Sequence, residues 1–235
     1  MHRKAATGVL GLVFLPACFS IPQPSPAPPP LGSATDVDGN VYPTVVIGTQ
    51  EWMAANLKST RYDDGTAIPN VTDAGAWNNL SASYCWYDND IANKDLYGAL
   101  YNWHTIYYKD QQAKICPTGF YLPSSEVWQA LVDTLGGSAV AGAALKEAGT
   151  AHWAAPNTGA TNQSGFSALP AGYRDSDGTF KAKGQFTFGW GSDQDFIAFV
   201  SSYWGLQDES ETTLAGKSPW EDGYSIRCMR GVTPK

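Results

Sequence analysis

The stretch CPTGFYLPSSEVWQALVDTLGG, residues 116–137, contains the clearest helix signal in the chain. Ser124 can cap the helix with its hydroxyl oxygen, and Glu126 suits the positive end of the helix dipole. One apolar stripe follows at helical spacing, formed by Val127, Trp128, Leu131, Val132 and Leu135. Gly136 and Gly137 then end the helix, so the pattern predicts a helix that starts at Ser124 and stops before these glycines.

On the N-terminal side of this helix, the sequence predicts short strands joined by turns. Asp38-Gly39 has the positive-φ chemistry of a tight hairpin, and Gly48-Thr49 predicts a second turn between two strands. Residues 95–104 carry apolar side chains at helical spacing, which predicts a second, short buried helix. His104 would lie at the end of that helix as a hydrogen-bonded residue rather than a catalyst.

On the C-terminal side, the pattern changes after residue 165 to strands and long loops. Strands are predicted at 186–190, 196–204 and 224–229, whereas 205–222 is polar and acidic and predicts a loop. The fold class is therefore α+β, with N-terminal hairpins, two short helices and a β-rich, loop-rich C-terminal half.

The first 34 residues have the composition of an export and anchoring segment. An apolar run at 5–17 follows a basic start and is too short to span a bilayer. Leu15-Pro16-Ala17-Cys18 resembles a bacterial lipobox, which predicts a signal peptide at 1–17 and lipidation of Cys18; an ordinary secretory signal is the alternative. Prolines after Cys18 predict an extended stalk at 18–34, ahead of a domain at 35–232. We expect a lipid-anchored envelope protein, at the outer membrane or cell surface.

Cysteine usage constrains disulfides and metal sites. Lipidation of Cys18 leaves Cys85, Cys116 and Cys228 in an oxidising compartment, where one disulfide and one leftover thiol is the simplest arrangement. No Cys-x-x-Cys occurs, so structural zinc is not expected and we predict no metal centre. Acidic clusters between 193 and 222 leave a structural calcium ion open as an alternative, although acidic loops are usually solvated surface.

Five stretches of the chain together resemble one known family. In chain order they read DVDGNVYPTVVIGTQEWMAANLKSTRYDDGTAIP, YGALYNW, CPTGFYLPSSEVWQAL, GFSALPAGYRDSDGTF and GYSIRCMRG. They closely resemble the Fibrobacter succinogenes major paralogous domain of bacterial surface lipoproteins, over residues 36–230. That family is similar to the C-type-lectin-like fold, in the branch that also contains formylglycine-generating enzymes.

The resemblance implies a C-type-lectin-like fold and one particular disulfide. In such a fold the first helix region and the last strand lie side by side, so Cys116 is expected to pair with Cys228. Cys85 is then the leftover thiol, buried among aromatic side chains. The segment from Trp190 to Trp220 departs from the family pattern, and a binding surface would differ most there.

Three classes of function are open on this basis: an enzyme, a binding module and a structural protein. The redox-active cysteine pair of formylglycine-generating enzymes is not matched, and neither His104 nor His152 lies in a hydrolase motif. We therefore predict no enzyme, no catalytic residue and no cofactor. Exposed aromatic rings stack on sugars or anchor protein contacts, and at most one or two of the aromatic candidates are expected to be exposed. The candidate ligand-binding residues are Trp190, Tyr203, Trp204 and Trp220.

The expected function is a non-catalytic binding or adhesion module for a polysaccharide or a protein partner, attached to the membrane through lipid only. The alternative is a structural envelope protein without a small ligand. Exposed tryptophans would favour binding, whereas fully buried tryptophans would favour the structural alternative. Removal of residues 1–17 leaves a net charge of −9, from 13 basic and 22 acidic side chains, which excludes a basic nucleic-acid face.

Overall fold

The computed structural model describes Met1 and residues 32–108, 111–112 and 114–231. The predicted signal peptide, the predicted lipidation site Cys18 and the predicted stalk up to residue 31 lie outside the described residues. Gly32–Ala34, which the sequence assigned to the end of the stalk, instead belong to the first strand. Within the described part, no helix is long and apolar enough to cross a membrane.

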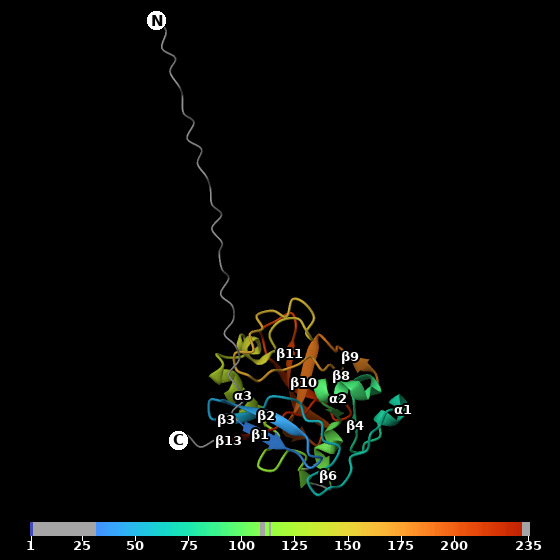
Figure 1. Ribbon diagram of the computed structural model, residues 1–235. Coiled ribbons are helices and arrows are strands. Elements are labelled where there is room, and N and C mark those ends of the chain that lie inside the picture. Colours follow the sequence, from blue (N-terminus) through green and yellow to red (C-terminus); the bar gives the residue numbers. More distant parts are fainter. Residues whose placement is uncertain (2–31, 109–110, 113, 232–235) are drawn as a thin grey trace.

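An antiparallel sheet joins the two ends of the domain. It contains β1 (Gly32–Thr35), β2 (Val41–Ile47), β3 (Gln50–Met53) and β13 (Met229–Gly231), in the order β1-β2-β3-β13. The N-terminal hairpins are therefore confirmed, with positive φ at Gly39 and Gly48. Figure 1 shows β13 next to β3, so the last strand completes the sheet that the first strands begin.

The predicted central helix is α3 (Ser125–Thr134), and a shorter helix, α4 (Ala141–Leu145), follows it. Ser124 caps α3, because its side-chain oxygen accepts a hydrogen bond from the Val127 amide. The apolar stripe of α3 packs in a core that also contains Trp52, Phe166 and Trp204. Burial of this stripe, rather than helix propensity alone, stabilises so short a helix.

A second antiparallel sheet contains β10 (Phe186–Asp195), β11 (Val200–Gln207) and β12 (Leu214–Pro219). The prediction of a loop over 205–222 is therefore wrong, since β11 extends into this range and β12 pairs with β11 over Leu214–Pro219. β12 is polar because it is an edge strand, and Lys217 and Pro219 are typical of exposed edges.

The remaining elements are short, and three of them lie where the sequence predicted a second helix. Only Lys94–Tyr97 is α-helical there, because the φ of 75° at Gly98 ends the helix. A side chain at this position would collide with the Leu57 carbonyl, so glycine is required. The chain then enters β5 (Leu100–Tyr101), which pairs with β4 (Tyr84–Cys85). The short elements are α1 (Ala74–Trp77), β4 (Tyr84–Cys85), η1 (Tyr87–Asn89), η2 (Ile91–Asn93), α2 (Lys94–Tyr97), β5 (Leu100–Tyr101), η3 (Trp103–Thr105), β6 (Tyr107–Tyr108), β7 (Gln111–Gln112), β8 (Tyr173–Arg174) and β9 (Phe180–Lys181).

Buried cations supply hydrogen-bond donors to these loops. Arg174 is fully buried and donates to the carbonyl oxygens of Val71, Thr72 and Gly178. Lys146, also fully buried, donates from Nζ to three other backbone carbonyls. Irregular backbone lacks the partners that a helix or sheet provides, and a buried carbonyl without a donor is costly. Long cationic side chains fill that role here.

Candidate functional site

The four aromatic residues predicted to bind a ligand lie mostly in the core. Trp190 is completely buried, Trp204 and Trp220 are 2% and 6% exposed, and Tyr203 is half-buried. The prediction that the tryptophans could act as exposed anchors is therefore wrong. All nine tryptophans of the chain are buried.

Packing from both sides explains this burial. The Trp190 indole nitrogen donates to the Tyr101 carbonyl at 2.8 Å, and its ring lies 4.6 Å from that of Tyr224. Trp204 points to the opposite face of the sheet and stacks on Trp128 of α3, with ring centroids 4.6 Å apart. Successive side chains of β10 and β11 point to opposite faces of their sheet, and other parts of the domain cover both faces there. Neither face therefore presents a row of aromatic rings to solvent.

Exposed apolar side chains gather instead where β10 turns into β11. We call residues 196–199 the hairpin tip. Phe196, Ile197 and Phe199 are 47%, 94% and 59% exposed. The turn is held by Asp195, whose Oδ1 accepts hydrogen bonds from the Ile197 and Ala198 amides, both at 3.1 Å. The tip is therefore an ordered projection that keeps large apolar groups in water, at a cost that binding of a partner would remove.

Trp220 is the base on which the hairpin tip rests. Its ring contacts Phe196 and Phe199 edge-on, at centroid distances of 5.5 and 5.4 Å. On its other side it stacks on Trp103 at 4.8 Å, and its amide donates to the Phe199 carbonyl at 3.2 Å. The predicted residue Trp220 therefore belongs to the site as a support, whereas the side chains above it provide the exposed surface.

A groove continues from the hairpin tip across the neighbouring loops. It encloses about 380 Å³ and is lined by Tyr62, Ala67, Pro69, Leu80, Ser81, Ala82, His104 and Tyr107. Tyr107 connects the two features, because its ring packs against Phe196 at 5.0 Å. Leu80 adds a further exposed apolar side chain at the groove. We call this surface the aromatic groove; together with the hairpin tip it forms the candidate functional site.

His104 lies in the aromatic groove, within η3, and not at the end of the short helix predicted over residues 95–104. Its ring packs edge-on against Trp220, and its Nε2 atom is 3.7 Å from a carboxylate oxygen of Glu221. Burial lowers the pKa of His104, although Glu221 opposes the shift. The imidazole is therefore mostly neutral near pH 7. A neutral ring in an aromatic setting suits packing and hydrogen bonding to a ligand.

The cysteines follow the pattern that the family resemblance implied. Cys116 and Cys228 form a disulfide, with Cα atoms 5.8 Å apart and 112 residues between them in sequence. Cys85 is a buried free thiol among Trp77, Tyr87 and Leu100. Burial raises the pKa of Cys85 to about 12, so it is protonated and unreactive.

The acidic side chains between 193 and 222, all of them described, do not gather into a cation site. Among the residues that the structure describes, no three His, Cys, Asp or Glu side chains are placed to hold a metal ion. Asp222, in the segment suggested for calcium, instead accepts a hydrogen bond from the Ser218 hydroxyl at 2.6 Å. Burial raises the pKa of Asp222.

Sequence patterns missed the residues that form the hairpin tip. Residues 196–199 read Phe-Ile-Ala-Phe and were assigned to the start of a strand, which the structure begins only at Val200. Asp195 was the residue that could have indicated the turn. An aspartate side chain often accepts hydrogen bonds from the backbone amides of the next two or three residues and so initiates a turn.

Comparison with known proteins identifies one family. The model of the Fibrobacter succinogenes major domain matches residues 45–230, which is most of the chain. No curated protein matches the chain, and no solved structure matches it.

Proposed function

The chain belongs to the Fibrobacter succinogenes major domain family, and we propose that it is a non-catalytic binding or adhesion module of the cell envelope. The observation that carries this proposal is the hairpin tip, with its three large apolar side chains exposed on a fixed aromatic base. Clusters of exposed apolar side chains on a protein surface mark interaction sites. The ligand is a polysaccharide or a protein.

The character of the hairpin tip favours a protein as the partner. Ile197 is its most exposed side chain and has no ring face on which a sugar could stack. The carboxylate of Asp195 is occupied by the turn amides and by Lys217, whose Nζ lies 3.4 Å away. The tip therefore offers apolar contact with few free polar groups. An apolar depression on a protein suits it better than a hydroxylated chain does.

The cellular setting that we propose comes from the N-terminal sequence. The lipobox-like Leu15-Pro16-Ala17-Cys18 and the prolines after it support a lipid anchor and a stalk. An outer-membrane or cell-surface position follows from this arrangement, and the domain would stand away from the bilayer.

A C-type-lectin-like architecture is part of the same proposal. Two features support it: the last strand pairs with β3 of the N-terminal sheet, and long loops connect short elements between them. The segment from Trp190 to Trp220, where the chain departs from the family pattern, contains the hairpin tip and its support. Variation in this segment would change the partner without changing the core.

The structural alternative has a specific observation in its favour. Burial of all nine tryptophans is what a scaffold without a ligand predicts, and it removes tryptophan as a source of exposed anchors. The two functions therefore differ in what they require of the hairpin tip. A binding module needs its exposed side chains, whereas a scaffold does not.

The experiment compares the full-length protein, reconstituted in liposomes, with an Ile197→Ser, Phe199→Ser variant. Retention on a panel of purified polysaccharides is measured beside retention on envelopes of the producing bacterium, before and after protease treatment. We expect protease-sensitive retention on envelopes, weakened at least about tenfold in the variant, since apolar interface anchors contribute more than 1 kcal/mol each.

Ile91→Ser is the matched control, because Ile91 is 63% exposed on a different element, η2. It should bind as the unmodified protein does. Protease-resistant retention, or retention on a purified polysaccharide, would identify a carbohydrate ligand instead. Equal retention of the tip variant would refute the site, and no retention in any arm would support the scaffold.

A further inference from the structure

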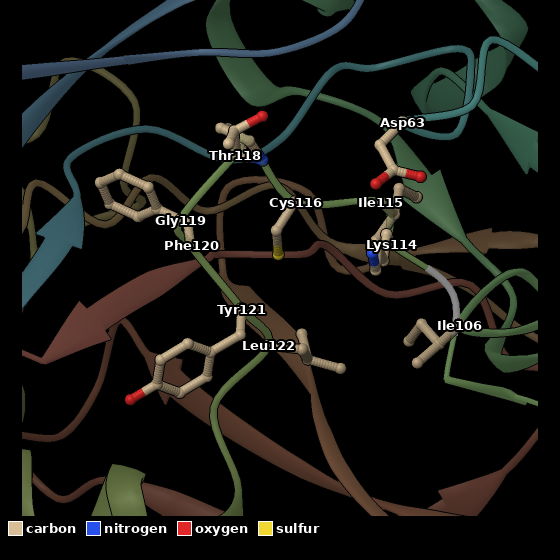
Figure 2. Close-up of a pocket in the computed structure, with 11 residues that line it drawn as sticks. Asp63, Ile106, Lys114, Ile115, Cys116, Thr118, Gly119, Phe120, Tyr121 and Leu122 are labelled. Atoms are coloured by element: carbon tan, nitrogen blue, oxygen red, sulfur yellow. The ribbon is translucent and has the colours of Figure 1, made fainter.

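A second cavity lies beside the disulfide, and none of the hairpin-tip residues lines it. It encloses about 430 Å³, within the usual range for small-molecule sites of roughly 300–1,000 Å³. Figure 2 shows the Cys116 sulfur between two walls, with Asp63 and Lys114 on one side and Phe120 and Tyr121 on the other. We call this cavity the disulfide pocket.

The frame of the disulfide pocket is tied to the rest of the fold. The Cys116–Cys228 bridge joins its middle to the last strand region, and Tyr121 and Met229 exchange two backbone hydrogen bonds, at 2.8 and 2.9 Å. The Asp63 amide donates to the Lys114 carbonyl at 2.9 Å, which keeps these two residues adjacent. The backbone on both sides of the pocket is therefore held in place before a ligand arrives, and only the side chains of Asp63 and Lys114 would have to be ordered.

The charges of Asp63 and Lys114 are available to a ligand. Neither side chain takes part in an ion pair or a side-chain hydrogen bond within the described residues, and they make no ion pair with each other. Other charged side chains near loops, such as Lys58 and Asp95, do pair, at 2.7 Å. One wall of the pocket thus offers a carboxylate and an ammonium group side by side, both unused.

The same pocket also offers an apolar wall. Ile106, Ile115 and Leu122 line it, and all three are buried. An apolar group of a ligand would lose its contact with water there, while the ligand's charges remained at Asp63 and Lys114. A complementary ligand therefore carries a cation, an anion and an apolar body within a short distance.

We propose that the disulfide pocket binds a small zwitterion with an apolar group, of the class of an α-amino acid with an aliphatic side chain. Its ammonium group lies at Asp63, its carboxylate at Lys114, and its side chain against Ile106, Ile115 and Leu122. Each charge-assisted contact adds selectivity because it cannot be made by a ligand that lacks that group. The proposal does not depend on the hairpin tip, so the two sites are tested separately.

Calorimetric titration of the full-length protein in detergent tests this inference with three related probes. Leucine carries both charges, 4-methylpentanoate lacks the ammonium group, and 3-methylbutylamine lacks the carboxylate. We expect saturable binding of leucine, and binding of each truncated probe weakened by about 10- to 100-fold, as for loss of one hydrogen bond to a charged group.

Variants assign each contact to its residue. In Asp63→Asn the preference for leucine over 4-methylpentanoate should disappear, while in Lys114→Gln the preference over 3-methylbutylamine should disappear. Asp88→Asn makes the same charge change at an exposed position outside the pocket and should leave all three titrations unchanged. Circular dichroism confirms that each variant is folded.

Several outcomes would overturn the proposal. They are absence of saturable leucine binding by the folded protein, equal binding of the three probes, and leucine binding that survives both pocket substitutions. Displacement of leucine by a neutral sugar at comparable concentration would also overturn it, because the selectivity would then not come from charge.

Discussion

Arg174, in β8, and Lys146, directly after α4, serve two different regions of the domain, and each donates hydrogen bonds to three backbone carbonyls from a fully buried position. Neither forms an ion pair with a carboxylate among the described residues. Arg174 lies between two rings, 4.3 Å from the centroid of Trp77 and 4.9 Å from that of Phe180. Lys146 has a single ring nearby, Trp153 at 5.6 Å.

The chemistry of the two cations differs as much as their surroundings. A guanidinium group presents its donors in a fixed plane and stays charged at any relevant pH. An ammonium group is a compact, titratable charge. Burial lowers the pKa of Lys146 to about 8, although Asp208 and Glu211 oppose the shift. Both a buried arginine and a buried lysine can therefore hold irregular backbone in place, but only the contribution of the lysine depends on pH.

Removal of the guanidinium should have the largest effect. Arg174→Met leaves the carbonyls of Val71, Thr72 and Gly178 without their donor and removes the cation from between two rings. We expect the free energy of unfolding to fall by on the order of 4 kcal/mol, as measured by urea denaturation. Arg174→Lys should recover only part of this loss, because lysine keeps the positive charge but lacks the planar set of donors of the guanidinium group. A loss below about 1 kcal/mol in Arg174→Met would show that the carbonyls find other partners.

Lys146→Met should be the next most damaging change. It removes the donor of the carbonyls of Thr158, Gln207 and Ser210, and with it the link between two loops. We expect a loss on the order of 3 kcal/mol near neutral pH, smaller than for Arg174 because only one ring is involved. Urea denaturation gives the value. A loss larger than that of Arg174→Met would reverse the ranking of the two regions.

The contribution of the rings can be separated from that of the hydrogen bonds. Phe180→Leu keeps an apolar side chain beside Arg174 but removes the aromatic face. We expect a loss of about 1–2 kcal/mol in the unmodified background. In the Arg174→Met background the same substitution should cost less, and this double-mutant cycle measures the cation–ring coupling. Equal costs in both backgrounds would mean that the ring contributes packing alone.

The pH dependence is the effect that only the lysine region should show. The folded state binds fewer protons at Lys146 than the unfolded state between about pH 8, its folded pKa, and pH 10.5, the ordinary lysine value. The free energy of unfolding therefore rises with pH in this window. Relative to Lys146→Met, the unmodified protein should gain stability from about pH 8 to about pH 10. A constant difference between the two proteins would contradict the lowered pKa.

Local signals in the sequence predicted the elements that depend on local chemistry. The capped helix α3 and the turns at Gly39 and Gly48 follow from residues within a few positions of one another. The Cys116–Cys228 disulfide followed from the family resemblance, since no local pattern specifies which cysteines pair. Of these features, only the disulfide lies at the disulfide pocket, and none lies at the hairpin tip.

The features that the sequence did not predict depend on distant contacts. Residues after 95 have helical spacing, but the helix ends at Gly98, whose φ is 75°. β12 reads as a loop because an edge strand keeps polar side chains. The residues next to Trp190 and Trp204 in sequence do not indicate that the two rings are buried. They are buried by distant residues: Trp190 bonds to Tyr101, and Trp204 stacks on α3. Aromatic composition therefore indicated the region of the candidate site but not its exposed residues.

The edge position of β1 has a mechanical consequence. This strand pairs with β2 alone, over Gly32–Thr35, and the chain before it continues from Gly32. A pulling force that enters at Gly32 therefore loads β1 first and detaches its few hydrogen bonds in succession. The Cys116–Cys228 bridge lies beyond this strand and resists extension of the segment that it closes. In the proposed lipid-anchored arrangement, β1 would detach under tension before the segment closed by the disulfide is extended.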